Sequence, residues 1–179
     1  MKVELVVPHV GLQESYLGFV EEFRQRSEPL IPFCVGFATD DFCAFLKKLN
    51  DCSLGIGIPE EFSTHTTYWL VRDDREVVGV SSLRHRITEA LWKDGCHIGY
   101  GIRPSERRKG YATLILKETL KKARERGIQK VFITCHKGNI GSSRTIRKNG
   151  GILESEYQLP NHSDLMQRYL IAEEWLQTR

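Results

Sequence analysis

The feature that most constrains this chain is a strand-like run that passes through a cationic turn into a helix. Residues 98–112 read Ile-Gly-Tyr-Gly-Ile-Arg-Pro-Ser-Glu-Arg-Arg-Lys-Gly-Tyr-Ala. Pro104 ends the strand, and Gly110 removes a side chain where the backbone must approach a ligand closely. Because the first N–H groups of a helix lack internal partners and carry the positive end of its dipole, this turn predicts an anion site.

Positive charge is concentrated around this turn. Residues 103–148 hold 14 Lys and Arg against 3 Asp and Glu, whereas the rest of the chain holds 12 against 20. The two balances, +11 and −8, sum to the net charge of +3. Such a segment indicates an anionic partner, either nucleic acid or a phosphorylated cofactor, and a solvated basic helix face is the third interpretation.

The apolar spacing along the chain predicts one α/β domain over residues 1–179. Helices are expected over 11–25, 41–50, 110–126 and 139–149, with Asp40 as the cap of the second and a short helical turn over 88–94. Strands are expected over 2–7, 66–71, 76–87, 96–103, 129–135, 151–158 and 164–171. This order predicts a mixed central sheet with helices on both faces.

The composition is typical of a globular protein. The 179 residues are 40% hydrophobic and 27% charged, which is enough to bury a core. No apolar run approaches the ~20 residues of a membrane helix, and because the first residues include an acid and no long apolar run, we do not expect them to be a secretion signal. We expect a cytoplasmic monomer or homodimer with no membrane partner. Five cysteines without a Cys-x-x-Cys pair indicate reduced thiols, and no metal is expected.

The spacing of the turn excludes two common phosphate-binding motifs. The Walker pattern Gly-x4-Gly-Lys-Ser/Thr is absent, and the dinucleotide pattern Gly-x-Gly-x-x-Gly begins at Gly99 but fails at Pro104. What remains is Arg107-x-x-Gly110-x-Ala112 after a strand.

This pattern resembles the GNAT family of N-acetyltransferases, and in particular a subgroup of predicted acetyltransferases. Three matching segments occur in the family's order over about residues 76–157. They are the strand ending Ile102-Arg103-Pro104, the loop positions Arg107, Gly110 and Ala112, and the later positions Asn139, Ser142, Lys148 and Gly150.

The resemblance implies that acetyl-CoA lies where two central parallel strands, here 96–103 and 129–135, splay apart. The backbone near Ile102 would pair with the pantetheine, and Asn139 would contact the same arm unless it serves only as a helix cap. The N–H groups of 107–112 would hold the pyrophosphate. The implied cofactor-binding residues are Ile102, Arg103, Arg107, Arg108, Lys109, Gly110, Tyr111, Ala112, Asn139 and Ser142.

The implied reaction is direct attack of a primary amine on acetyl-CoA in a ternary complex, which needs a base and benefits from an acid. Many members carry a tyrosine acid seven residues after the asparagine, but this chain has Ile146 there. The acid would then be Tyr100, Tyr157 or solvent. His97 and His85 are the candidate bases, with a structural role in the sheet as the alternative for each.

The first two helices and the loops 26–40 and 51–65 usually shape the acceptor pocket in this fold. These segments and their borders carry the aromatic residues Phe33, Phe37, Phe42, Phe62 and Tyr68 and the acids Glu28, Asp40, Glu60 and Glu61. The acids would attract a cationic small-molecule or peptide amine, unless they are simply solvated and the aromatic residues belong to the core.

Two other functions compete with acetyl transfer. One is a sensor module that binds acyl-CoA with reduced catalysis, which the replacement by Ile146 favours. The other is nucleic-acid binding by the basic segment. Because the aromatic residues are mostly not interleaved with its cations, as stacking platforms require, we expect no nucleic-acid partner.

Overall fold

The computed structural model describes residues 2–59, 62–89, 91, 96–159 and 164–172. Glu60, Glu61 and most of the predicted turn at 88–94 lie outside this part of the chain. The helices are α1 (Gln13–Gln25), α2 (Phe42–Leu54), α3 (Tyr111–Glu125) and α4 (Ile140–Lys148). The strands are β1 (Val3–Val6), β2 (His65–Arg72), β3 (Glu76–Arg84), β4 (Ile98–Ile102), β5 (Lys130–His136), β6 (Ile152–Gln158) and β7 (Leu165–Ala172).

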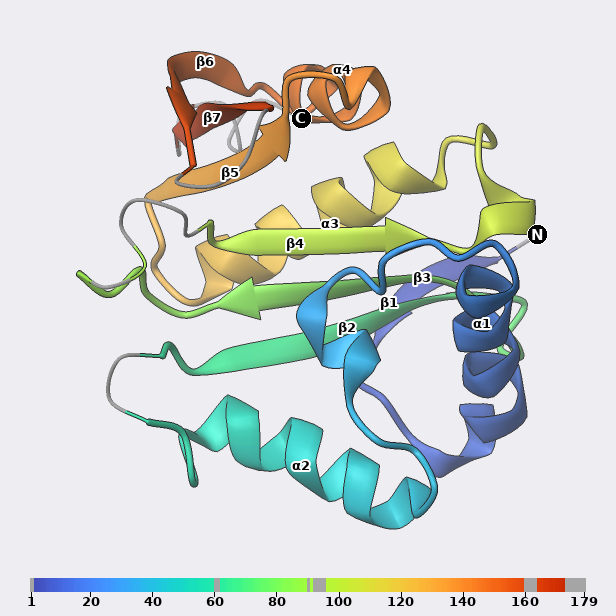
Figure 1. Ribbon diagram of the computed structural model, residues 1–179. Helices are drawn as coiled ribbons and strands as arrows, with labels where there is room; N and C mark the ends of the chain where they lie inside the picture. The colour runs from blue at the N-terminus through green and yellow to red at the C-terminus, as the bar shows by residue number, and fades with distance from the viewer. Residues whose placement is uncertain (1, 60–61, 90, 92–95, 160–163, 173–179) are drawn as a thin grey trace.

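The strands form two antiparallel ladders, in the orders β1-β2-β3-β4 and β5-β7-β6. In Figure 1, α1 and α2 lie in front of the four-stranded sheet and α3 lies behind it. Trp69 and Val80 pack in the core on the side of α1 and α2, whereas Val78 and Leu83 pack on the side of α3. Because both faces are covered, β2 and β3 are almost continuously buried.

The two ladders meet just before β4. The backbone N–H of His97 donates to the carbonyl oxygen of Phe132 on β5, at 2.8 Å. From there the ribbons of β4 and β5 run in the same direction and separate toward their carboxyl ends (Figure 1). The loop between β4 and α3 lies at this diverging end.

The predicted α/β fold is confirmed, with shifts at the ends of elements. The strand expected over 76–87 ends at Arg84, and α2 continues four residues further than predicted, to Leu54. The predicted cap at Asp40 is wrong by one residue, because the Asp41 carboxylate accepts the hydrogen bond from the Ala44 N–H at 2.9 Å. None of the five cysteines forms a disulfide.

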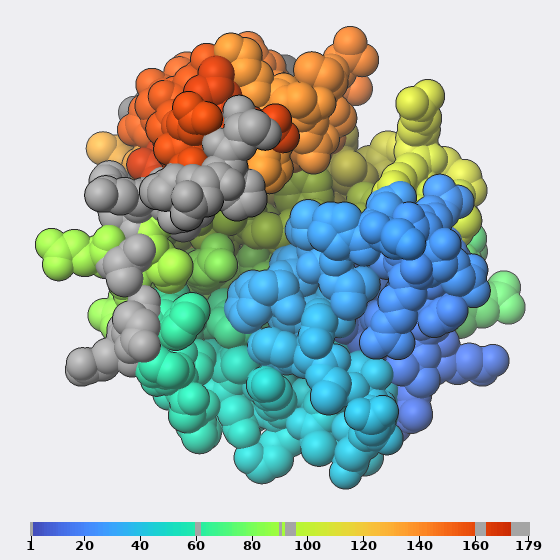
Figure 2. Space-filling model, viewed as in Figure 1, coloured from blue at the N-terminus to red at the C-terminus, as the bar shows by residue number. Residues whose placement is uncertain are grey.

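The surface in front of the sheet is hollowed (Figure 2). The hollow lies between the blue segments around α1 and the orange lobe of β5 and α4, and its floor is yellow-green, the colour of the β4–α3 region. Within the described residues, no helix is long and apolar enough to span a membrane, and no group of three or more His, Cys, Asp or Glu side chains could hold a metal ion.

Candidate active site

The loop before α3 presents unpaired hydrogen-bond donors. Gly110 is the N-cap of α3 with φ +87°, a left-handed conformation that other residues rarely adopt, and a Cβ atom there would meet nothing within 4 Å. Among the described residues, the backbone N–H groups of 107–110 donate to no protein acceptor. Unpaired N–H groups at a helix N-terminus, with open space at the Cβ position of Gly110, suit an anion.

The three cations of this loop have different surroundings. Arg107 Nη1 donates to a Glu28 carboxylate oxygen at 2.9 Å, and Lys109 Nζ lies 3.0 Å from a Glu106 oxygen. Arg108 is exposed and forms no ion pair with the described residues. Arg107 therefore ties the loop to the segment after α1. Its hydrogen bond lowers the pKa of Glu28, so this carboxylate is not free to attract an amine.

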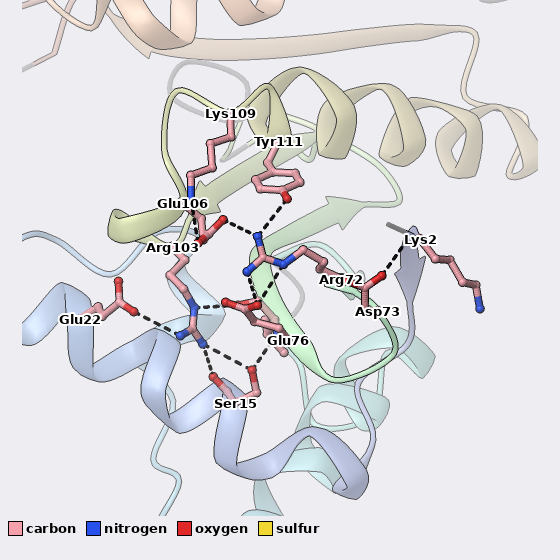
Figure 3. Close-up of polar contacts among 11 residues, drawn as sticks. Lys2, Ser15, Glu22, Arg72, Asp73, Glu76, Arg103, Glu106, Lys109 and Tyr111 are labelled. Carbon is pink, nitrogen blue, oxygen red and sulfur yellow. Dashed lines mark hydrogen bonds and ion pairs between the residues drawn. The ribbon is translucent and has the colours of Figure 1, made fainter.

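Arg103 points away from the loop and into the protein (Figure 3). Its guanidinium donates to the carbonyl oxygens of Ser15 and Val77 and pairs with Glu22 at 3.2 Å. The Arg103 backbone N–H is bonded to the Val78 carbonyl oxygen. The side chain of Arg103 thus fastens α1 to β3 and points away from the loop that is predicted to hold the cofactor.

A second arginine fixes the base of the loop. Arg72 Nη1 lies 2.8 Å from a Glu106 oxygen and 3.3 Å from the Tyr111 hydroxyl, and Arg72 also pairs with Glu76 (Figure 3). Burial alone would raise the pKa of Glu106, but the contacts with Lys109 and Arg72 lower it below its usual value. The carboxylate of Glu106 therefore stays charged, and its ion pairs with Arg72 and Lys109 hold the loop in place.

Tyr100 on β4 faces α4. Its hydroxyl lies 3.0 Å from the Ser142 hydroxyl, and burial raises the pKa of Tyr100 to about 12. Asn139 caps α4 by accepting the Ser142 N–H at 3.0 Å, so the capping interpretation of Asn139 is confirmed. Ile146 is fully buried in the core. A protonated phenol from β4 therefore lies beside α4, the helix in which Ile146 replaces the family's tyrosine.

His97 joins the two ladders through its ring. Its Nδ1 accepts the backbone N–H of Phe132 at 3.0 Å, and burial, with a smaller effect of Arg84, lowers the pKa of His97 to about 4. The neutral ring must then carry its proton on Nε2. In this state His97 donates at Nε2, and it can accept a proton only by giving up the bond to Phe132.

The His85 ring is hydrogen-bonded near the end of α3. Arg126, which follows this helix, donates to the Thr66 hydroxyl oxygen at 3.0 Å, and that hydroxyl can donate in turn to His85 Nε2 at 2.8 Å. Burial, with smaller effects from Arg126 and His65, lowers the pKa of His85 to about 4. The structure therefore does not bring the two predicted bases together.

The face of the sheet that meets α1 and α2 carries a row of polar residues missed in the sequence. His65 pairs with Arg84 between β2 and β3, and the Arg84 N–H donates to the His97 carbonyl oxygen at 2.7 Å. Thr67, Ser82 and Gly99 form the adjacent row. Residues directly opposite in antiparallel strands share a face, but the register was not visible in the sequence.

The Gly-x-Gly of β4 makes room for the segment between α1 and α2. A Cβ atom on Gly101 would lie 2.1 Å from the Ile31 carbonyl oxygen, and one on Gly99 would lie 3.3 Å from Pro32 Cβ. The two glycines therefore allow residues 31–32 to pack directly on β4. They serve this packing and not the dinucleotide motif that they partly imitate.

The aromatic residues expected at the acceptor pocket divide into two groups. Phe42 and Tyr68 are buried and belong to the core. Phe33 and Phe62 are 46% and 55% exposed, and Phe37 is partly buried. Phe33 directly follows the segment that packs on β4.

Solved structures share this fold. The microcin C7 self-immunity acetyltransferase MccE, in complex with acetyl-CoA and AMP, superposes with a TM-score of 0.67 at 17% identity over 96% of this chain and 92% of that one. The acetyltransferase of Salmonella typhimurium that modifies the N-terminal serine of ribosomal protein L7/L12 gives 0.66 at 16%, over 96% and 95%. Mutant forms of the spermidine/spermine N-acetyltransferase SpeG from Vibrio cholerae give 0.64 at 11%, over 99% of both.

The sequence itself identifies the family. Comparison with curated proteins gave no match. The family model of the acetyltransferase (GNAT) domain matches residues 37–152, which include β4, the loop and α3, α4 and the start of β6. The chain therefore belongs to the GNAT acetyltransferase family and is an acetyl-CoA-dependent acyltransferase.

Proposed function

We propose that this protein transfers the acetyl group of acetyl-CoA to a primary amine by direct attack in a ternary complex. The observation that carries the proposal is the set of unpaired N–H groups at 107–110, in front of the open space at Gly110. Proteins of similar structure that hold acetyl-CoA, or that act on spermidine or on a protein N-terminus, support acetyl-CoA as the cofactor and an amine as the acceptor.

The cofactor is proposed to lie along the diverging ends of β4 and β5. The N–H groups of residues 107–112 would hold the pyrophosphate, and Arg108 would meet the adenosine phosphate, joined by Lys109 if it leaves Glu106. The backbone at Ile102, together with Asn139 and Ser142, would border the pantetheine arm. The side chain of Arg103 would instead join α1 to β3, and that of Arg107 would hold the loop to Glu28.

The proposed chemistry uses few side chains. The amine nitrogen attacks the thioester carbonyl carbon, the C–S bond breaks, and the departing sulfur takes the proton of the Tyr100 hydroxyl. The proton lost by the new amide nitrogen passes to solvent and ultimately restores Tyr100. We assign His97 a positioning role, because its Nδ1 is occupied by Phe132 and its Nε2 is a donor. Most of the rate gain would come from holding both reactants together.

A paired measurement of binding and turnover tests this function. We expect calorimetry to show acetyl-CoA binding, and a thiol-release assay to show turnover with at least one primary amine. Gly110→Asp should abolish both, because it places a carboxylate beside the pyrophosphate. Near-native CoA affinity in this variant would contradict the loop assignment. CoA binding without thiol release across a broad amine panel would favour the sensor module.

We also propose that residues 1–179 act as one catalytic domain in the cytoplasm, as a monomer or homodimer. The proposal rests on the composition and on the single succession of elements through both ladders. Light scattering of the purified chain measures its mass, and a trimer or larger assembly would contradict this part.

A further inference from the structure

Arg84 stands in the row of polar residues on the face of α1 and α2. It lies between His65 on β2 and His97, the residue that precedes β4. Adjacent strands are about 4.8 Å apart, so Arg84 lies one strand away from the amino end of β4, the strand along which the cofactor is proposed to lie.

Arg84 is a half-buried cation without an acidic partner among the described residues. Its Nη1 donates to the Cys96 carbonyl oxygen at 2.8 Å, and its guanidinium lies 5.5 Å from the centre of the Phe33 ring. In contrast, the half-buried arginines Arg72 and Arg103 each pair with glutamate. A partly desolvated charge is unfavourable unless an opposite charge compensates it, so Arg84 has capacity for an anion.

Two buried polar atoms on the same face also lack partners. They are the hydroxyl of Ser82, two residues before Arg84 on β3, and Nε2 of His65. Ser82 is 2% and His65 5% exposed. The His65 ring contacts Phe33, with centroids 4.8 Å apart, and Phe33 is 46% exposed. Buried polar groups are usually satisfied, so these atoms indicate a place where a bound molecule completes the hydrogen bonding.

We propose that Arg84 binds a carboxylate or phosphate group of the acceptor, so that the acceptor is an amine carrying an acidic group a few bonds away. This inference rests on the proposed acetyl transfer. A polyamine would meet the uncompensated charge of Arg84, whereas an acidic group would neutralise it. Arg84 also lowers the pKa of His65 and His97, although less than burial does, which indicates a positive potential on this face.

Matched acceptors test the proposal. One pair is glycine and glycinamide, which differ in the carboxylate, and the other is phosphoethanolamine and ethanolamine, which differ in the phosphate. We expect kcat/KM to favour the acidic member of at least one pair by about tenfold to a hundredfold, the range of a charge-assisted hydrogen bond. The pair with the larger ratio identifies the anionic group. Equal rates within both pairs, or a preference for spermidine, would overturn the proposal.

Variants of Arg84 test whether this residue causes the preference for acidic acceptors. Arg84→Gln should remove the preference for the acidic acceptor, mainly by raising the KM for that acceptor. Arg84→Lys should retain part of the preference because the positive charge remains. Arg75→Gln is the matched control, since Arg75 is exposed in the turn at the opposite end of the same two strands. A Gln variant that keeps the native preference would contradict the assignment. A Gln variant that lowers kcat/KM equally for both acceptors of a pair would also contradict it.

A binding measurement separates this proposal from the proposed function. The protein saturated with CoA should bind the acidic amine in calorimetry, whether or not acetyl transfer occurs, and Arg84→Gln should weaken this binding about tenfold or more. Native affinity of the Gln variant in this complex would overturn the anion site even if turnover is observed. If acidic amines bind but no amine is acetylated, the anion site stands and the transferase proposal fails.

Discussion

The hydroxyl of Tyr100 on β4 lies 3.0 Å from the hydroxyl of Ser142 on α4, which connects the four-stranded sheet to the helix that follows β5. Because burial raises the pKa of Tyr100 to about 12, the phenol keeps its proton throughout the neutral range. The contact therefore places a proton donor at the boundary between the two ladders. In the proposed reaction this phenol would supply the acid in a chain that has Ile146 in place of the family's tyrosine.

Tyr100→Phe should lower kcat by about a hundredfold and leave the CoA affinity within a few fold of native, because it removes a proton and not a binding surface. Thiol release and calorimetry give the two quantities. Tyr157→Phe is the comparison, since Tyr157 is the other candidate for a tyrosine acid. If Tyr157→Phe loses activity and Tyr100→Phe does not, the acid has been assigned to the wrong tyrosine.

Glu106→Gln should reduce the free energy of unfolding by about 2 kcal/mol at neutral pH, because Arg72 and Lys109 each lose a charged partner. Urea unfolding measures the loss. Glu118→Gln is the matched control, since Glu118 forms an exposed pair with Lys121 and should change stability by no more than about 0.5 kcal/mol.

The same carboxylate gives a pH dependence of known sign. The folded-state pKa of Glu106 is lowered, so its contribution is fully present above the unfolded value of about 4.3 and disappears as the pH falls through the lower folded value. The difference in stability between the native chain and Glu106→Gln should therefore shrink below about pH 4. A constant difference from pH 7 to pH 3 would show that the carboxylate is not charged in the folded protein.

The sequence predicted what depends on local patterns. The loop before α3 was found because a strand, a glycine and an amphipathic helix follow one another directly. The Gly, Pro, Ser and Thr content of 51–65 predicts a loop from residue 51, yet α2 continues to Leu54 and ends at Gly55, a left-handed C-cap that is a typical helix stop. Buried Leu49 and Cys52 continue the helical spacing to that stop.

Contacts between distant segments were not predictable. The family resemblance implies that Arg103 and Arg107 bind the cofactor, whereas the structure shows that they also bind Ser15 and Glu28, which lie 88 and 79 residues away in the chain. The pairing of His65 with Arg84 depends on the register of two strands. A one-residue slip would place those side chains on opposite faces, so neither composition nor spacing identifies this pair.

His97→Ala should reduce kcat about tenfold or more while the CoA affinity changes little, because the ring holds β4 to β5 through the Phe132 N–H. The structure further predicts no inflection from His97 in the pH–rate profile above about pH 5, since the pKa of His97 is lowered to about 4. A limb near pH 6.5 in the native chain that vanishes in His97→Ala would restore this residue as the base.

The lowered pKa of His97 also affects stability. The folded protein disfavours the charged ring, so this contribution is fully present above the unfolded pKa of about 6.5 and is lost as the pH falls toward about 4. His97→Gln should therefore lose less stability than the native chain between these values in urea unfolding. The pKa of His85 is lowered in the same way, so the free energy of unfolding of the double variant with His85→Gln should depend even less on pH in this range.

Gly101→Ala should destabilise the protein more than Gly99→Ala, because the added methyl group meets backbone in one case and a side chain in the other. At Gly101 the new Cβ would lie 2.1 Å from the Ile31 carbonyl oxygen, so residues 31–32 must move, at a cost of roughly 1–3 kcal/mol. At Gly99 the nearest atom is Pro32 Cβ at 3.3 Å, and a small shift suffices. Thermal unfolding should show a loss of about 2–4 °C per kcal/mol. Since Phe33 moves with this segment, Gly101→Ala should also raise the acceptor KM without changing CoA affinity, and equal stability and KM in both variants would show that residues 31–32 are not held against β4.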